Sequence, residues 1–547
     1  MRTITRSFPV ILFVLIFLLC GACGRHPAGD RGGPSLSAST SPSNRGKAFS
    51  GSEVTSASGT LKGEKQEGLL IFKGIPYAKP PVGALRWRPP QAPEPWKGTR
   101  DCTGFGPRCP QPESLLARSD RDQSEDCLYL NVWTPAKSAD EKLPVMVWIH
   151  GGSFVTGAGS NPAYDGTHLA KKGAVIVTIN YRLGPLGFFA HPALSKESDH
   201  GVSGNYGILD MIAALTWVKQ NIAAFGGDPG CVTIFGESAG SMSVTCLMAS
   251  PLAQGLFHRA IAESNFAIGL PALKERKRLM KAYEEVGVDI ARKLGVKEEG
   301  DVLKELRAKS PGELIGASDP VKGLTGKGVT FRPVIDGYVL PQDPVKVFAE
   351  GKQHPVPFMS GINADEGSIF VKQMPVSTVE GYKRFLKARF RERAEDALAL
   401  YPASDDREVP GALGALITDL IFLMPVKYAV REVRNAGSPA YLYYFTKKPA
   451  AAKALNMGSF HGLEVAYVFG YEGKFWKPSE KNRKLSHAMG SYWVNFAAKG
   501  DPNGPGLPAW PVYESSPDEY LELGDDIKAA GGLRKKYCEF CEKALGE

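Results

Sequence analysis

Short apolar runs alternate with longer stretches of helical periodicity along most of the chain. Runs rich in β-branched and aromatic residues predict strands at 145–149, 175–180, 232–235, 356–359 and 441–445. Residues 208–225 instead carry apolar side chains at helical spacing. Continuous apolar strands that alternate with helices are typical of a parallel sheet buried on both faces. The pattern therefore predicts an α/β fold, with a central, mostly parallel β-sheet flanked by helices.

Polar and glycine-rich segments follow four of the predicted strands. Residues 150–154 follow one strand, Ser238 another and residues 361–367 a third, while His461 lies in a loop well after a fourth. Functional groups in such sheets gather beyond the carboxyl ends of the strands. We therefore expect these segments to meet at one edge of the sheet.

Composition and charge narrow the class of protein. The chain has 547 residues, of which 43% are hydrophobic and 22% charged, as in a globular protein with a large core. The formal net charge is +9, but Lys and Arg are interleaved with Asp and Glu. We therefore expect no nucleic-acid surface. No second linker interrupts the pattern, which predicts one large domain at 51–547.

The first residues have the pattern of a targeting segment. Arg2 and Arg6 precede an apolar run at 8–19, which is too short to span a bilayer. We interpret residues 1–22 as a signal peptide. The residues before Cys23 resemble the bacterial lipoprotein cleavage pattern, although Cys20 stands where leucine is usual. Lipid attachment at Cys23, which would tether the protein to a membrane, and simple secretion are both kept as alternatives.

Residues 23–50 are rich in Gly, Ser, Pro and Ala and lack apolar periodicity. This composition predicts a flexible linker between the export signal and the domain. We expect an exported protein that is periplasmic, extracellular or lipid-anchored to a bacterial envelope.

The nine cysteines fit an exported protein. Without Cys20 and Cys23 an odd number remains, so at least one thiol should be free. Cys231 and Cys246 are a poor pair, because a strand and the returning helix should separate them beyond disulfide distance. Cys538 and Cys541 form a C-x-x-C in a charged tail, where a local bridge or free thiols are expected.

Ser238 lies in Gly236-Glu237-Ser238-Ala239-Gly240, directly after a predicted strand. In a Gly-x-Ser-x-Gly segment, the small residues allow a sharp turn from strand to helix that exposes the serine hydroxyl. A serine needs a base to accept its proton, and the base needs an acid to orient it. The sequence therefore makes Ser238 a candidate nucleophile.

In a chain order of serine, acid and histidine, the acid would come from residues 361–367. Two histidines follow that segment, His461 and His487. His487 lies in a helical pattern and His461 in a loop with small neighbours, which favours His461. Asp365 and Glu366 are adjacent, and the residues alone do not separate them. Backbone N–H groups of Gly152, Ser153 and Ala239 could bind an oxyanion.

A metal site at His461 and Glu464 is disfavoured, because no third ligand has suitable spacing. No metal and no organic cofactor are expected.

Several longer segments carry a family pattern. They are residues 225–240, 125–133, 74–78 with 80–83, and 500–503. On these segments the chain resembles the type-B carboxylesterase/lipase family, the cholinesterase-like branch of the α/β-hydrolases, over about 51–524. Their combination is highly specific.

The resemblance implies roles that the spacing leaves open. It assigns the acid to Glu366, and it places the supporting residues of the site at Glu237, Ser264 and Glu464. It also implies a disulfide between Cys109 and Cys127. The commoner glycine or alanine of the family is replaced by Ser153, whose side chain is expected to narrow the acyl side.

The implied function is hydrolysis of small to medium carboxylate esters by Ser238, His461 and Glu366 through an acyl-enzyme intermediate. The partner is a small-molecule ester, and no obligatory protein partner is evident. The alternative is a non-catalytic cholinesterase-like binding or adhesion module. Presence of all three residues in this chain disfavours that alternative.

Overall fold

The computed structural model describes residues 49, 51–112, 122–264, 266–277, 280–321, 324, 328–473 and 479–546. The predicted signal peptide at 1–22, Cys23 and, apart from Phe49, the predicted linker at 23–50 lie outside these ranges.

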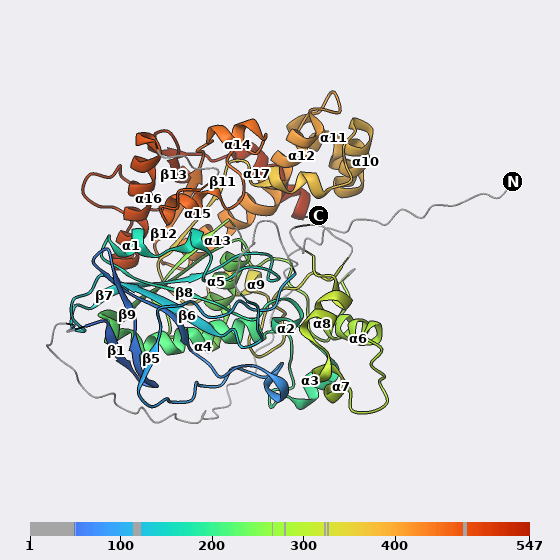
Figure 1. Cartoon of the computed structure of the whole chain (residues 1–547). Coiled ribbons are helices and arrows are strands. Elements are labelled where there is room, and N and C mark those ends of the chain that lie inside the picture. The colour runs from blue at the N-terminus through green and yellow to red at the C-terminus, as the bar shows by residue number, and fades with distance from the viewer. Residues whose placement is uncertain are drawn as a thin grey trace, which may run out of the picture.

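A large twisted sheet runs through the centre of the fold (Figure 1). In spatial order its strands are β14 (Ile527–Gly531), β13 (Glu519–Leu523), β12 (Ala440–Phe445), β11 (Phe358–Asn363), β10 (Arg259–Glu263), β9 (Gly227–Glu237), β7 (Leu143–Ile149), β8 (Val175–Ile179), β6 (Tyr129–Thr134), β4 (Leu69–Pro76) and β3 (Glu64–Gln66). Neighbours from β8 to β13 are parallel, and the pairs at both edges are antiparallel. A small separate sheet joins β1 (Glu53–Ser56), β2 (Gly59–Lys62) and β5 (Thr99–Asp101).

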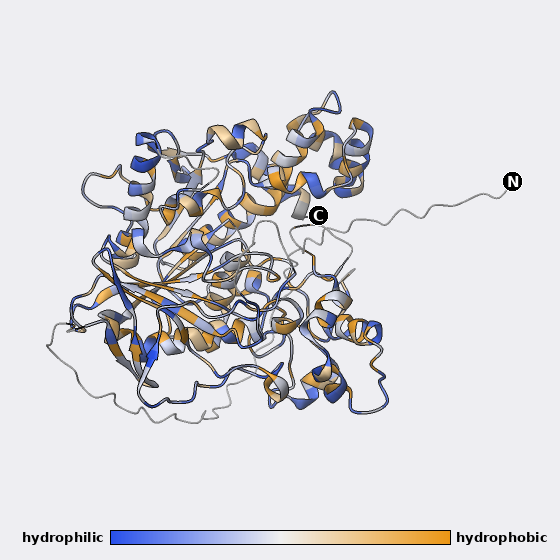
Figure 2. Cartoon of the chain, in the orientation of Figure 1, coloured by the Kyte–Doolittle hydropathy of each residue, from blue (hydrophilic) through white to orange (hydrophobic). Residues whose placement is uncertain are grey.

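The continuous apolar strands of the sequence arise because the sheet is buried on both faces. In β7, Val145, Val147 and Ile149 belong to one hydrophobic cluster. Met146 and Trp148, which alternate with them, belong to the second cluster on the opposite face. Figure 2 shows hydrophobic residues along the central strands. Strands of this kind need helices on each side.

Helices cover the two faces. On one face α4 (Tyr206–Asn221) and α5 (Ala239–Ala249) pack against β9, and α13 (Met424–Asn435) packs against β11 and β12. On the other, α16 (Glu480–Lys499) packs against β7 and β9 beside α1 (Thr167–Ala170) and α15 (Leu463–Val468). The remaining α-helices are α2 (Gly184–Gly187), α3 (Pro192–Glu197), α6 (Tyr283–Lys293), α7 (Val302–Ala308), α8 (Pro311–Ser318), α9 (Pro344–Ala349), α10 (Val379–Phe390), α11 (Ala394–Leu400), α12 (Val409–Ile417), α14 (Ala450–Ala454) and α17 (Lys535–Gly546). Short 3₁₀ turns are η1 (Gly83–Leu85), η2 (Pro162–Tyr164), η3 (Ile222–Phe225), η4 (Pro251–Ala253), η5 (Glu366–Ile369), η6 (Val371–Gln373) and η7 (Arg391–Arg393), and η8 (Thr418–Leu423) is a π-helix.

The predicted fold class is confirmed, with a single domain built around one central sheet. Every predicted strand lies wholly or partly on an observed one, and the predicted helix at 208–225 is α4 continued by η3. The prediction at 356–359 was displaced, because β11 begins at Phe358 and continues through Gly361 to Asn363. Parallel pairing to β10 and β12 overrides the weak strand preference of glycine and asparagine.

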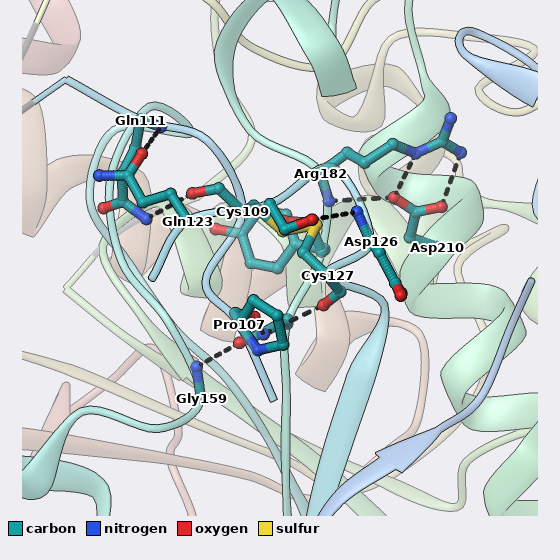
Figure 3. Close-up of a disulfide and its surroundings, with 12 residues drawn as sticks. Pro107, Cys109, Gln111, Gln123, Asp126, Cys127, Gly159, Arg182 and Asp210 are labelled. Atoms are coloured by element: carbon teal, nitrogen blue, oxygen red, sulfur yellow. Dashed lines mark hydrogen bonds and ion pairs between the residues drawn. A yellow bond between two sulfur atoms is a disulfide. The ribbon is translucent and has the colours of Figure 1, made fainter. Parts of the chain in front are cut away.

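Cysteines follow the expected pattern only in part. The disulfide implied for Cys109 and Cys127 is present, with a Cα–Cα distance of 5.0 Å (Figure 3). Cys231 and Cys246 are free, as expected for an unsuitable pair. Cys538 and Cys541 are also free, which is one of the two expected outcomes, and both are buried in α17.

The apolar segment Val409–Asn435, which joins α12, η8 and α13, is long and apolar enough to cross a membrane by length and composition. Most of its apolar window, 72%, is buried inside the protein. Burial of this extent is the pattern of a core helix, and the segment packs beside η5 and β11.

A buried ion pair ties the end of β8 to α4. The guanidinium of Arg182 donates from Nε and Nη2 to Asp210 at 2.8 and 2.7 Å, and the backbone N–H of Arg182 donates to the same carboxylate at 3.0 Å (Figure 3). Arg182 is 2% exposed and Asp210 is fully buried. Loss of one partner would leave an uncompensated charge in the core.

We therefore expect Asp210→Asn to lower the free energy of unfolding by about 3 kcal/mol. Asp405→Asn is the matched control, because its partner Arg407 is 90% exposed and solvent screens that pair. Denaturant unfolding of the two variants tests the difference. Equal effects at the two positions would contradict a dominant role for the buried pair.

Candidate active site

Three neighbouring parallel strands deliver the candidate residues to one edge of the sheet. The register pairs Glu237 of β9 with Glu263 of β10, and Glu263 with Gly361 of β11. Ser238 therefore follows β9 directly beside Ser264, and the N–H of Ser238 donates to the carbonyl of Glu263 at 2.9 Å. The carboxyl ends of these strands meet at one place, as the sequence predicts.

Ser238 stands at a strained turn between β9 and α5. Its backbone has φ 58° and ψ −118°, values that are uncommon for a residue with a side chain. The turn is pressed against β7: a Cβ at Gly236 or Gly240 would lie 2.5 or 2.0 Å from the carbonyl oxygen of Ile149. Glycine is required at both positions by this close approach, which explains the Gly-x-Ser-x-Gly pattern.

His461 contacts a carboxylate at each ring nitrogen. Its Nδ1 is 2.5 Å from Oε2 of Glu366, and its Nε2 is 3.0 Å from Oε1 of Glu237. The rings of Phe370 and Phe422 flank the imidazole, with centroids 5.2 and 4.9 Å away. The histidine is thus fixed in orientation by Glu366 and by the two aromatic rings.

The structure separates the adjacent acids that the sequence did not. Glu366 is fully buried, and it accepts hydrogen bonds from Ser264 Oγ at 2.6 Å and from the N–H of Asn363 at 2.7 Å. Asp365 turns away from His461: it accepts from the N–H of Ser459 and pairs with Lys448, both at 2.8 Å. The turn after β11 thus directs only one carboxylate to the imidazole.

The other proposed supporting residues lie in the same cluster. Ser264 Oγ also lies 3.2 Å from Glu464 Oε1, and Asn363 Nδ2 donates to the second oxygen of Glu464. Asn363 was missed by the sequence analysis, although its place beyond the predicted strand was a usable signal. Glu263 was missed as well; it accepts from Nε1 of Trp493 at 2.9 Å.

The segment after β7 lies against the serine turn. A Cβ at Gly151 would be 3.1 Å from Cβ of Ser238 and 2.7 Å from the carbonyl of Glu237. The carbonyl of Gly152 accepts from the N–H groups of Val155 and Thr156, both at 3.0 Å. These bonds fold the segment into a tight turn beside Ser238.

Backbone strain continues in this turn. Ser153 and Phe154 both have positive φ, 56° and 61°. Ala239 is the first residue of α5, where backbone N–H groups have no partner within the helix. The predicted oxyanion donors Gly152, Ser153 and Ala239 are thus in two segments that meet at Ser238.

Among the described residues no hydrogen bond joins Ser238 Oγ to His461. Nε2 of His461 faces Glu237 instead, and Gly462 lies against the same carboxylate, where a Cβ would be 3.3 Å from Oε1. Catalytic hydrogen bonds are often long or poorly aligned in an empty site and tighten with substrate.

Burial and charge shift the titration of the cluster. Burial alone would lower the pKa of His461, but the carboxylates of Glu237 and Glu366 raise it to about 9. Burial raises the pKa of Glu237, although the nearby His461 opposes the shift. Burial likewise raises the pKa values of Glu263 and Glu464. Protons are therefore retained on part of the acidic cluster at neutral pH.

No group of three or more His, Cys, Asp or Glu side chains that could hold a metal occurs within the described ranges. His461 and Glu464 do not form a metal site together, because the carboxylate of Glu464 is bonded to Ser264 and Asn363. The chemistry that this arrangement can perform is nucleophilic attack assisted by a base.

The chain is similar to known proteins over most of its length. Residues 50–541 match the carboxylesterase family. The fumonisin B1 esterase of Sphingopyxis macrogoltabida is 39% identical over 502 residues, covering 89% of this chain and 88% of that protein. The para-nitrobenzyl esterase of Bacillus subtilis is 39% identical over 492 residues, covering 87% and 95%. A solved PNB esterase structure has a TM-score of 0.77 at 36% identity and covers 89% of this chain and 99% of its own.

The contact between Ile149 and the serine turn predicts the effect of one added methyl group. Gly240→Ala would place Cβ 2.0 Å from a backbone oxygen that cannot move away without shifting β7. We expect this variant to lose about 2 kcal/mol of stability. The measurement is denaturant unfolding.

Gly316→Ala is the control, because Gly316 lies in α8 with nothing within 4 Å of the added Cβ. Helix propensity predicts a gain of about 0.5–1 kcal/mol there. A Gly240→Ala variant as stable as the parent protein would show that the close approach is not a constraint.

Proposed function

The chain belongs to the carboxylesterase family and is a carboxylic ester hydrolase, and we propose that it works through Ser238, His461 and Glu366. The observation that carries the proposal is the 2.5 Å contact of His461 Nδ1 with Glu366, next to a serine at a strained strand-to-helix turn. Its substrates are small to medium carboxylate esters. The two relatives described above are both named as esterases, which supports this class of substrate.

In the proposed mechanism, Ser238 Oγ attacks the ester carbonyl and its proton passes to Nε2 of His461. Glu366 accepts the Nδ1–H bond, which fixes the tautomer that presents a free Nε2 and stabilises the imidazolium once it forms. The imidazolium then protonates the leaving alcohol. The product of this half-reaction is an ester between the acyl group and Ser238.

Water completes the reaction. His461 removes a proton from the water that attacks the acyl group on Ser238, and the same imidazole returns a proton to Oγ as the carboxylic acid leaves. Nε2 of His461 must exchange protons with Ser238 and with water, but it now faces Glu237. The contact between Nε2 and Glu237 must therefore open or shift when substrate or water approaches.

Negative charge on the carbonyl oxygen is stabilised by backbone N–H groups of Gly152, Ser153 and Ala239. Two segments provide them, the turn after β7 and the start of α5, and both lie against Ser238. Such donors act most strongly where the charge develops, in the transition state. Positive φ values at Ser153 and Phe154 support this role, because strained backbone of this kind clusters at functional sites.

We also propose that the protein is exported. Residues 1–22 serve as a signal peptide, 23–50 as a flexible linker and 51–547 as the hydrolase domain. The Cys109–Cys127 disulfide supports export, because such bonds persist in oxidising compartments. Lipid on Cys23 would tether the enzyme to a bacterial envelope membrane; mass spectrometry of the mature N-terminus distinguishes this from cleavage with release.

Ser238→Ala tests the nucleophile. We expect kcat for p-nitrophenyl butyrate to fall by about 10⁴-fold or more, because residual rates in such variants come only from binding and oxyanion stabilisation. The unfolding midpoint should be unchanged. Ser491→Ala, at a half-buried position of α16 whose hydroxyl donates to the carbonyl of His487, is the control and should retain full activity. Normal turnover by the Ser238→Ala variant would refute the assignment.

Glu237→Gln tests the electrostatics. His461 acts as a base only when neutral, so activity should rise with pH through its pKa, which the two carboxylates hold near 9. Removal of the Glu237 charge destabilises the imidazolium and lowers this pKa. The acidic limb of the kcat/KM profile should therefore move to lower pH by about one unit.

Glu464→Gln is the matched control for this pH profile, because Glu464 is also buried but its carboxylate is bonded to Ser264 and Asn363 rather than to His461. Its limb should move much less. A Glu237→Gln profile that is unmoved, or moved to higher pH, would contradict the proposed charge balance.

A further inference from the structure

A buried glutamine in the disulfide-bounded segment is bonded to the turn that follows β7. Gln111 lies two residues after Cys109 and is 5% exposed. Its Nε2 donates to the carbonyl of Gly157 at 2.9 Å, and its Oε1 accepts from the N–H of Gly157 at 2.9 Å. One side chain thus satisfies both backbone groups of one residue, as a neighbouring strand would.

Gly157 packs against His150 and Gly151, at the start of the turn that follows β7. It has φ +119°, and a Cβ there would lie 2.3 Å from Nδ1 of His150 and 2.7 Å from the carbonyl of Gly151. Nδ1 of His150 lies 2.8 Å from that carbonyl, which accepts its hydrogen bond. A displacement of Gly157 would therefore move Gly151, which packs against Ser238.

The glutamine is itself held in place by its own loop. Its N–H donates to Oε1 of Gln123 at 2.8 Å, and its Nε2 also donates to the carbonyl of Cys109 at 3.0 Å (Figure 3). The disulfide joins Cys109, two residues before Gln111, to Cys127, two residues before β6.

A second contact links the disulfide to the same turn. Sγ of Cys109 lies 3.1 Å from the carbonyl oxygen of Tyr181. The Tyr181 hydroxyl donates to the carbonyl of His150 at 2.8 Å, and the two rings stack with centroids 4.4 Å apart. Residues 150–157 are therefore contacted at both ends, at Gly157 by Gln111 and at His150 by Tyr181, which lies against Cys109.

We infer that Gln111 is a positioning residue for the oxyanion hole, and that the Cys109–Cys127 disulfide acts on catalysis through it. The inference rests on the proposed function, because it assigns the turn after β7 to transition-state stabilisation. Oxyanion donors must lie about 2.7–3.1 Å from the developing charge, and losing one costs about 10²–10³ in kcat. Loss of a side chain that only holds these donors in position should lower kcat by less than the loss of a donor itself.

The first test replaces Gln111 by methionine, which keeps the length of the side chain and removes both bonds to Gly157. We expect kcat for p-nitrophenyl butyrate to fall about 10-fold or more with KM within about twofold, because oxyanion donors act on the transition state. Rates are divided by the number of active sites titrated with an organophosphate, so that loss of folded enzyme does not count. Gln111→Glu keeps the acceptor but turns a second oxygen toward the carbonyls of Cys109 and Gly157, so kcat should fall at least as far as in Gln111→Met.

The second test measures inhibition by a trifluoromethyl ketone. If Gln111 only stabilised the fold, its replacement would leave the ketone inhibition constant unchanged. Binding of a trifluoromethyl ketone, which forms an oxyanion with the serine, should weaken in parallel with kcat/KM in the Gln111 variants. Gln353→Met is the matched control, since Gln353 is 4% exposed and equally buried but does not contact this turn. It should lose stability without any change in the ketone inhibition constant.

The disulfide is tested by combination. Cys109→Ala with Cys127→Ala should lower kcat in the same way, and adding Gln111→Met to that background should cost much less than in the parent, because the two act along one route. Fully multiplicative losses, or a Gln111→Met variant with kcat within twofold of the parent, would overturn the inference. If Ser238→Ala stays active, the proposed function fails instead; if it is inactive while Gln111→Met is fully active, only this inference fails.

Discussion

The site depends on one close backbone contact, the carbonyl oxygen of Ile149 against the turn that carries Ser238. Glycines at 236 and 240 allow this contact, and any larger residue would push β7 away from β9. The contact has two consequences. It fixes the serine above the sheet, and it brings the segment that follows Ile149 beside the serine, where its N–H groups can face a bound carbonyl. Nucleophile and oxyanion donors are therefore positioned by the same packing.

Electrostatics form the second layer of the site. Glu237, Glu263, Glu366 and Glu464 are all nearly or fully buried around one imidazole, and burial raises the pKa of three of them. An uncompensated charge is costly in such surroundings, so the cluster depends on internal hydrogen bonds from Ser264, Asn363 and Trp493. The protons that Glu263 and Glu464 retain keep the net charge near His461 low. Glu366 can then accept the Nδ1–H bond of His461 without repulsion from charges on Glu263 and Glu464.

Periodicity in the sequence was sufficient for the sheet and for the order of the candidate segments. Apolar runs of β-branched residues located the central strands because those strands are buried on both faces. The choice between Asp365 and Glu366 was beyond such reasoning, since it depends on the direction of one turn after β11 and on distant partners such as Ser264, which is 102 residues from Glu366. The family resemblance assigns the acid to Glu366, and Glu366 is the one of the two that contacts His461. Gln111 gave no signal at all, because a glutamine in a polar loop shows its role only through its contact with Gly157.

Strain at the site explains why so large a sheet surrounds it. Ser153, Phe154, Ser238 and Ser264 all have positive φ, and a conformation of this kind costs about 1–3 kcal/mol per residue. An isolated loop would relax. Here each strained residue directly follows, or packs against, a strand whose register is fixed on both sides, and the helices on both faces prevent the strands from moving apart. Stability in the core thus keeps the site in a geometry that no local sequence preference would favour, and the hydrogen bonds from Gln111 extend the same support to the one side of the turn that the sheet does not reach.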